Sequence, residues 1–481
     1  MLRKLGVTVL GLVAIATALS IVSHFRIAAG EATEEKRVAA ALARSEFSVA
    51  ELHEDIAQVR IWLATVHPEE IPVFPLAQID EALERAEASI VRPVNHKTFY
   101  QKLAPAVHAL NDEHTMLFPP DRARESSARK FPFEIAIVDG QPLIRAGAIG
   151  DVGPGDQIQS INDLPAERII DSLSSNYAGT DKRQRLAYLE DDFDAALSLD
   201  GGTQAPYSIV VHDRVTEANT TVNSNGVLRT PVDEPAFELD MIRRGTLLFS
   251  YNAFEDDEGQ FDDFLEGLFA TARHEDVETL IIDLRRNRGG ATEFGDRILE
   301  YLTDQPFTQL TRVDVRVSEL AKQEFLRSVP GFLRWIPIQY IHPILRRLWT
   351  SNTGDVASVD FEEISPTDNP LRFHGDVYVL IGPRTMSSAS LFAAAVRHYG
   401  IGTLVGEKTG GYTTMYGNII DARLPNTGLK VWMPTSVVYG HGAGPVEPDH
   451  EVRDSAKDIA ETRDAALEYV LFATAGQRNS N

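Results

Sequence analysis

The chain has 481 residues, 43% of them hydrophobic, and a formal net charge of −24. Its length predicts about three domains, and its composition is that of a folded protein with many turns. The absence of cysteine excludes disulfides, thiolate metal sites and a cysteine nucleophile, while the acidic charge argues against a nucleic-acid partner.

The first 30 residues have the features of a targeting segment. The opening MLRK supplies two positive charges, residues 5–22 contain only Thr and Ser as polar members, and no acidic residue precedes Glu31. This pattern predicts either a signal peptide, with the small residues 28–30 as its cleavage site, or a membrane anchor. In both cases we expect the remainder to be exported, to the periplasm or another extracytoplasmic location, with residues 5–22 able to contact the inner membrane.

Residues 31 to about 125 are expected to form a helical N-terminal domain. Apolar residues recur there at three- and four-residue spacing, which is the period of an amphipathic helix. The segment closes with NDEHTMLFPPD, where Pro119 and Pro120 end any helix.

Residues 126–236 change to short strand-like runs separated by glycine-containing turns. One of these runs, VGPGDQIQSIN, resembles the L-x-x-G-D-x-I-x-x-I-N-G pattern of PDZ domains, although Asp163 replaces the final glycine. A generic hairpin is the alternative. We expect a PDZ-like domain followed by a linker, and such a domain could gate a site or hold a peptide by strand addition. The matching positions are Val152, Gly155, Asp156, Ile158, Ile161 and Asn162.

Residues 237–481 alternate between strand-like and helix-like segments, which predicts a layered α/β core with parallel strands. An apolar, aromatic and basic insert interrupts it at about 306–365, and its prolines prevent one long helix. The insert is expected to be either a packed surface subdomain or, through residues 329–349, a lid or membrane-interface element.

A serine-rich corner lies between an apolar run at 377–381 and an alanine-rich helical stretch that Gly400 ends. A strand, a tight turn bearing serine and a helix form the arrangement by which α/β hydrolases expose a nucleophile. The free N–H groups at the helix N-terminus favour a developing oxyanion. Ser387, Ser388 and Ser390 could equally be helix N-cap residues.

Four motifs occur in order along the chain: LNDEHT (110–115), IIDLRRNRGG (281–290), RTMSSASLFAAAVRHYG (384–400) and GPVEPDHEV (444–452). Together they resemble the tail-specific, or carboxyl-terminal processing, serine peptidase superfamily, and within it the branch of the tricorn core peptidase and the retinoid-binding-protein-like repeats. The resemblance covers most of residues 31–455 and implies a ClpP/crotonase-like catalytic core and a polypeptide substrate. No metal or nucleotide signature occurs, so no cofactor is expected.

The resemblance implies Ser387 as the nucleophile and leaves two mechanisms to compare. In a Ser/Lys dyad the lysine follows the tyrosine of the Y-G pair by thirteen residues, where this chain has Tyr412, and Lys408 comes four residues too early. In a Ser/His/Glu triad His114 occupies the histidine motif and Glu447 follows the serine by sixty residues. Serine needs a base to take its proton and an acid to orient the imidazole, so we favour the triad. The rival bases are His398 and His441.

The predicted oxyanion hole consists of the backbone N–H of Ser388 and one from Gly289 or Gly290. We therefore expect a serine endopeptidase that cleaves exported polypeptides through an acyl-enzyme. Because His114 belongs to the helical segment and Ser387 to the α/β core, the site is expected to form between domains. A non-catalytic peptide- or lipid-binding module on the same fold is the alternative from another class. Ser390 stands where relatives usually have glutamate, and Arg288 where they have proline.

Overall fold

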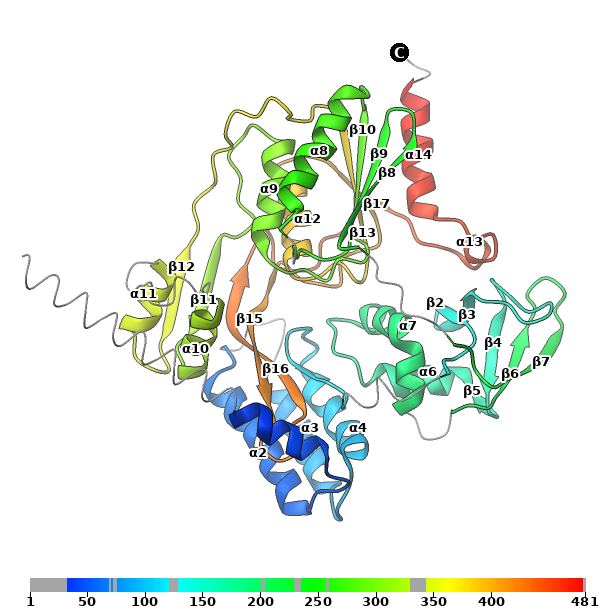
Figure 1. Cartoon of the computed structure of the whole chain (residues 1–481), viewed down its shortest axis with the longest axis vertical. Coiled ribbons are helices and arrows are strands. Elements are labelled where there is room, and N and C mark those ends of the chain that lie inside the picture. The colour runs from blue at the N-terminus through cyan, green and yellow to red at the C-terminus, as the bar shows by residue number, and fades with distance from the viewer. Residues whose placement is uncertain are drawn as a thin grey trace, which may run out of the picture. The chain divides into compact units, whose positions relative to one another are not determined.

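The computed structural model describes most of the chain from residue 33 onward (Figure 1). The predicted segment 1–30 lies outside the described residues, and so do residues 329–342 of the insert. No helix within the described ranges combines the length and the apolar character needed to cross a membrane. The described ranges are 33–68, 71, 76–120, 129–199, 204–228, 235–256, 259–328 and 343–478.

The chain divides into two compact units, and each unit draws on separate parts of the sequence. The first comprises Met1–Pro120, Arg312–Asp360 and Tyr416–Val438. The second comprises Asp121–Thr311, Phe361–Met415 and Tyr439–Asn481.

Helices dominate the N-terminal part of the first unit, as the spacing of apolar residues predicts. Helix α2 begins with a capping box, in which Ser48 Oγ accepts from the Glu51 N–H and the Glu51 carboxylate accepts from the Ser48 N–H. Its buried residues recur at helical spacing and face the core. After a helical stretch at 33–42, the elements are α2 (Val49–Thr65), α3 (Ala77–Ala88), α4 (His96–Val107) and the 3₁₀ turn η1 (His108–Leu110).

The insert contributes an antiparallel strand pair to the first unit. β11 (Arg312–Arg316) pairs with β12 (Val356–Asp360), and α10 (Glu319–Ser328) and α11 (Pro343–Thr350) lie between them in the chain. The two strands belong to the sheet of the first unit, and the lid or membrane role of residues 329–349 stays a prediction. The sheet runs in the order β1-β16-β11-β12, with β15 also on β16; the remaining strands are β1 (Met116–Leu117), β15 (Thr414–Arg423) and β16 (Lys430–Tyr439).

A PDZ-like sheet with two helices opens the second unit. Its strand order is β2-β3-β4-β6-β7, so β2 is an edge strand. Asn162 and Asp163 adopt φ of 49° and 64° in the turn after β4. Asn and Asp tolerate this left-handed conformation, which explains how aspartate replaces the usual glycine. The elements are β2 (Glu134–Val138), β3 (Gln141–Ala146), β4 (Gln157–Ile161), β5 (Leu164–Pro165), α6 (Ala166–Ser174), α7 (Lys182–Leu199), β6 (Tyr207–His212) and β7 (Asn219–Ser224).

The rest of the second unit is a six-stranded sheet between helical layers (Figure 1). One buried apolar cluster joins the sheet to α8, α9 and α12, and another joins its opposite face to α14. Five strands run parallel and only β8 runs antiparallel to its neighbour. The sheet order is β17-β14-β13-β10-β9-β8. The elements are β8 (Phe237–Arg243), β9 (Thr246–Tyr251), α8 (Phe261–His274), β10 (Thr279–Asp283), α9 (Thr292–Leu302), β13 (Asp376–Ile381), α12 (Ser388–His398), β14 (Thr403–Gly406), β17 (His450–Glu451), α13 (Ala456–Ala460) and α14 (Ala465–Arg478).

The predicted fold class is confirmed: a layered α/β core accompanies an N-terminal helical segment and a PDZ-like β-rich part. β10 and β13 are parallel neighbours with Asp283 opposite Leu380. Parallel neighbours end at the same edge of a sheet, so the glycine motif and the serine-rich corner leave the sheet side by side.

Candidate active site

The serine-rich corner is fastened to the glycine motif by hydrogen bonds. Thr385 Oγ1 donates to the Leu284 carbonyl at 2.7 Å, and the Met386 N–H donates to the Asn287 carbonyl at 3.2 Å. Both bonds lie just beyond the ends of β10 and β13. The sheet register therefore fixes where the corner begins.

Ser387 has a strained backbone, with φ of 53° and ψ of −129°. A left-handed conformation costs a non-glycine residue about 1–2 kcal/mol, so the surrounding bonds must hold it. Ser387 stands at the N-cap position of α12, yet its side chain makes no capping hydrogen bond. The capping alternative is therefore wrong for this residue, and the turn has the form of a nucleophile elbow.

The two neighbouring serines stabilise the turn instead. Ser388 Oγ donates to the Gly290 carbonyl at 2.6 Å, and the buried Ser390 Oγ donates to the Thr385 carbonyl at 3.1 Å. One bond reaches the glycine loop and the other reaches the strand side of the corner. Neither serine is the N-cap residue of α12, because both lie inside the helix, which begins at Ser388.

Gly289 allows the glycine loop to approach the serine. A Cβ on Gly289 would lie 2.6 Å from the Ser387 Cβ and 3.1 Å from the Ser388 nitrogen, and the residue has φ of 93°. The Gly289 N–H donates to Asn287 Oδ1 at 2.8 Å. Because this bond occupies the Gly289 N–H within the loop, the Gly290 N–H is the better candidate for the second donor of the oxyanion hole. Ser388 starts α12, where the first N–H groups have no acceptor within the helix.

Replacing Gly289 by alanine is expected to destabilise the chain and distort the turn. Overpacking typically costs about 1–3 kcal/mol, in addition to the strain of a positive φ. Gly140→Ala is the matched control, because Gly140 has φ of 82° and nothing within 4 Å of an added Cβ. Denaturant unfolding should show a larger loss of stability for Gly289→Ala, and equal losses would contradict the close approach.

The structure separates both rival histidines from the nucleophile end of α12. His398 ends this helix, so it lies about 15 Å along the axis from Ser388 at 1.5 Å per residue. His441 stacks on His398 with ring centroids 3.9 Å apart, and its Nε2 donates to the Thr308 carbonyl at 2.8 Å. Neither ring is therefore a candidate to take the Ser387 proton.

Lys408 forms an ion pair, with its Nζ 2.9 Å from Asp181 Oδ2. The hydrogen bond to Asp181 and the charge of that carboxylate raise the pKa of Lys408. An ammonium group has no lone pair with which to accept a proton. The geometry therefore argues against Lys408 as the base of a dyad.

Glu447 belongs to the same unit as Ser387 and its side chain is exposed. The Glu447 carbonyl accepts from the Arg397 guanidinium at 2.7 Å. The preceding Val446 exchanges hydrogen bonds with Thr409 through its N–H and its carbonyl. The backbone of this acidic residue is thus anchored while its carboxylate faces outward.

His114 lies in the first unit, within a fully buried polar cluster. Its Nδ1 is 3.4 Å from Asp112 Oδ1, and Thr115 Oγ1 donates to Asp112 Oδ2 at 2.8 Å. His67 joins through its Nε2, which is 3.3 Å from Thr115 Oγ1, while its Nδ1 donates to the Pro68 carbonyl. Sequence reasoning missed Asp112, although the residue stands in the same motif, and had no signal for His67.

The pKa values of this cluster reflect the competition between burial and charge. Burial alone lowers the pKa of His114, but the hydrogen bond to Asp112 and the charges of Asp112 and Glu113 raise it overall. Burial raises the pKa of Asp112, but His114 and Thr115 lower it overall. Burial lowers the pKa of His67 to about 4. Asp112 is therefore ionised and His67 neutral at pH 7.

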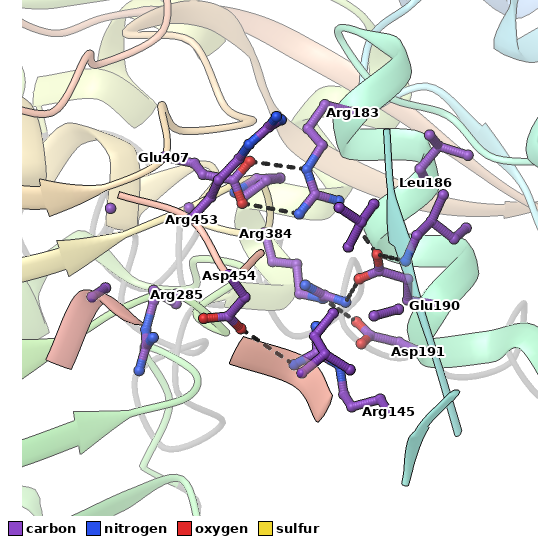
Figure 2. A pocket seen from close by; sticks show the side chains of 18 of the residues that line it. Arg145, Arg183, Leu186, Glu190, Asp191, Arg285, Arg384, Glu407, Arg453 and Asp454 are labelled. Carbon is purple, nitrogen blue, oxygen red and sulfur yellow. Dashed lines mark hydrogen bonds and ion pairs between the residues drawn. The ribbon is translucent and has the colours of Figure 1, made fainter. Parts of the chain in front are cut away.

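A cavity of about 1170 Å³ borders the strand side of the serine corner (Figure 2). Its lining combines the edge strand β2, helix α7 and the residues Gly382, Pro383 and Arg384. Glu190 on α7 is buried there: its Oε1 accepts from the Ile137 N–H at 2.7 Å and its Oε2 from Arg384 at 2.8 Å. One carboxylate thus links the PDZ-like edge strand to the start of the nucleophile turn.

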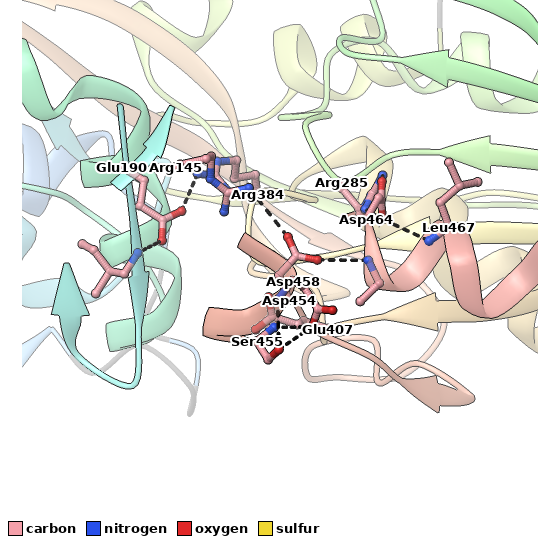
Figure 3. A network of polar contacts seen from close by, with 12 residues as sticks. Arg145, Glu190, Arg285, Arg384, Glu407, Asp454, Ser455, Asp458, Asp464 and Leu467 are labelled. Atoms are coloured by element: carbon pink, nitrogen blue, oxygen red, sulfur yellow. Dashed lines mark hydrogen bonds and ion pairs between the residues drawn. The ribbon is translucent and has the colours of Figure 1, made fainter. Parts of the chain in front are cut away.

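Further ion pairs surround this link (Figures 2 and 3). Arg183 binds Glu407 through two nitrogens at 3.0 and 2.9 Å. Arg384 also binds Asp191. Burial raises the pKa of Asp191, but the charges and hydrogen bonds of Arg384 and Arg288 lower it overall. Arg285 binds Asp464 through two nitrogens at 2.7 Å each. These charge-assisted pairs hold the loops around the serine corner.

Comparison with known proteins agrees with this geometry. The model of peptidase family S41 matches residues 246–449. The structure of mature CPAF complexed with lactacystin has a TM-score of 0.61 at 16% identity, covering 88% of this chain and 97% of that one. A crystal structure of mature CPAF gives a TM-score of 0.61 at 16% identity, covering 86% of this chain and 94% of that one. No curated protein matches the chain.

The fold and the family match together define the class of the protein, a serine peptidase. The peptidase family S41 model matches residues 246–449 of the α/β core, which confirms the resemblance recognised from the motifs. The likeness to CPAF, at 16% identity, shows the fold alone. The finer assignment to the tricorn-like branch stays a prediction.

Proposed function

We propose that this serine peptidase is an endopeptidase that cleaves exported polypeptides through an acyl-enzyme on Ser387. His114 takes the Ser387 proton, Glu447 serves as the acid of the triad, and the amides of Ser388 and Gly290 hold the oxyanion. The acylated serine is then hydrolysed by water that the same imidazole activates.

The observation that carries this proposal is the strained backbone of Ser387 at the N-terminus of α12, with the Gly289–Gly290 loop directly against it. The Ser387 side chain makes no capping hydrogen bond, and the first N–H groups of α12 have no acceptor within the helix, which supports an oxyanion site beside the serine. The alternatives for the base are weaker, since Lys408 is paired with Asp181 and His398 ends the far side of the helix. His114 is the remaining candidate among the predicted bases.

The location and the membrane contacts belong to the same proposal. The charged start and apolar run of the first 30 residues support export, with residues 5–22 serving as signal or anchor. Residues 329–349 are proposed as a second, weaker membrane or lid element because they are apolar, aromatic and basic. Polypeptides in the periplasm or a similar compartment are then the substrates.

The PDZ-like part is proposed to hold substrate by strand addition to β2. This strand is an edge of its sheet and lines the cavity beside the serine corner. Because the Ile137 N–H already donates to Glu190, a peptide that pairs fully with β2 must displace that carboxylate. Substrate entry would then also loosen the Glu190–Arg384 contact at the start of the turn.

Labelling with a fluorophosphonate tests the proposal against a non-catalytic binding module. We expect covalent labelling of the wild-type chain and none of Ser387→Ala, because only an activated serine reacts with this class of reagent. Ser390→Ala should still label, since its hydroxyl only supports the turn. Equal labelling of wild type and Ser387→Ala, or no labelling of either across pH 6–9, would favour the binding module.

A further inference from the structure

Asp112 is a buried carboxylate in contact with His114 within the first unit, and its two oxygens have different partners. Oδ2 accepts from Thr115 Oγ1 at 2.8 Å, which leaves Oδ1 facing His114 Nδ1 at 3.4 Å. Both side chains are buried, at 0% and 2% exposure. An ionised carboxylate can only accept, so Nδ1 carries the hydrogen of the neutral ring and Nε2 is the unprotonated nitrogen.

The loop that carries this pair is held by its neighbouring elements. η1 ends at Leu110, and its C-cap residue Asn111, with φ of 55°, leads into the loop that carries Asp112 and His114. Immediately after Thr115, β1 pairs with β16, and the Leu117 N–H donates to His108 Nε2 at 3.1 Å. The loop is thus held at both ends.

A second histidine supports the cluster from another segment. His67 contacts Thr115 through Nε2, and Arg316 donates to the His67 carbonyl at 2.8 Å. The His67 ring also packs edge-on against Tyr416, with centroids 4.3 Å apart. Among the described residues, the charged and titratable groups around this pair include Glu113 on the loop, and His67, His108 and Arg316 on neighbouring segments.

We infer that Asp112 is a positioning residue for His114: it fixes the Nδ1–H tautomer within the first unit, anchored by Thr115, and so keeps Nε2 available as the base. This inference rests on the proposed function, in which His114 is that base. It adds a second carboxylate to the proposed triad, and Glu447 is not needed to select the tautomer. The imidazolium formed during acylation would also be stabilised by Asp112.

The direct test uses the full chain with Ser387→Ala, which separates the tautomer from activity. Nitrogen-15 NMR of labelled histidines, with the His114 signals assigned by a His114→Gln variant, should show the Nδ1–H form at neutral pH. Asp112→Asn should convert it to the Nε2–H form, because the amide can donate to Nδ1. Glu113→Gln and Glu447→Gln should leave the Nδ1–H form in place. The inference would be overturned if Glu447→Gln changed the His114 tautomer and Asp112→Asn left it in the Nδ1–H form.

Kinetics in the active chain give the second readout. Asp112→Asn should lower kcat about 10²- to 10⁴-fold with little change in KM, and move the acid limb of the pH profile to lower pH. Should Asp112→Asn fail to fold, Thr115→Val keeps the carboxylate but removes its anchor, and should lower kcat about 3- to 10-fold. An unchanged kcat in a folded Asp112→Asn protein overturns the positioning role. The proposed function fails separately, if His114→Gln retains wild-type activity.

Discussion

Replacement of Ser387 by alanine is expected to reduce peptide hydrolysis about 10⁴- to 10⁶-fold, while leaving the fold intact. Loss of the nucleophile removes the acyl-enzyme route, and only binding and oxyanion stabilisation remain. The alanine should also be tolerated structurally, since the serine side chain makes no capping bond. Initial rates on an unfolded protein substrate and a fluorogenic peptide would measure the loss.

Ser390→Ala is the matched control for this substitution. It removes a buried hydroxyl of the same corner, which donates to the Thr385 carbonyl. A hydrogen bond of this kind contributes about 1 kcal/mol, so we expect the rate to fall less than about tenfold. If the two variants lost activity equally, the corner would be structural and Ser387 would not be the nucleophile.

The second large effect is expected at His114. His114→Ala should lower kcat about 10⁴-fold or more, because the Ser387 hydroxyl would lose its general base. Lys408→Ala should keep kcat within about threefold of the wild-type value, because the partly exposed Lys408–Asp181 ion pair contributes little to stability. His398→Ala should behave like Lys408→Ala. Loss of activity only in Lys408→Ala would replace the triad with a Ser/Lys dyad.

The pH dependence of the wild-type enzyme follows from the same histidine. The pKa of His114 is raised above its usual 6.5 because the hydrogen bond and charge of Asp112 outweigh burial. A base works only when unprotonated, so kcat/KM should fall as the pH drops through this raised pKa. The acid limb should therefore have its midpoint above pH 6.5. A midpoint below that value would mean that the imidazole does not keep its carboxylate partner.

Most of the architecture could be predicted because it follows from local patterns. The alternation of strand-like and helix-like segments after residue 237 predicted the layered core. The three- and four-residue spacing of apolar residues predicted the N-terminal helices. The serine corner could be placed at the edge of the sheet because parallel strands end together. The structure of the insert at about 306–365 could not be predicted in this way, because β11 and β12 pair across some forty residues and no short-range pattern indicates that pairing.

The details of the site depend on tertiary contacts that spacing does not encode. The strained φ of Ser387 is stabilised by bonds to Leu284 and Asn287, which lie about a hundred residues away. The hydrogen bond from the Gly289 N–H to Asn287 Oδ1 depends on the rotamer of the Asn287 side chain, which the sequence does not specify. Asp112 stood inside a recognised motif, yet its contact with His114 depends on the left-handed turn at Asn111. The motifs thus predicted which groups react, but not which groups orient them.

The central claim is that the Ser387 hydroxyl is activated by His114, and trapping the acyl-enzyme tests it most directly. The chain would be mixed with an active ester, quenched in acid at successive times and digested, and the acylated peptide identified by mass spectrometry. We predict an acyl group on Ser387 that forms within the first turnover, forms at least about 10²-fold more slowly in His114→Ala, and forms at an unchanged rate in Lys408→Ala. An acyl group on another residue, or an equal rate of acylation without His114, would contradict the account.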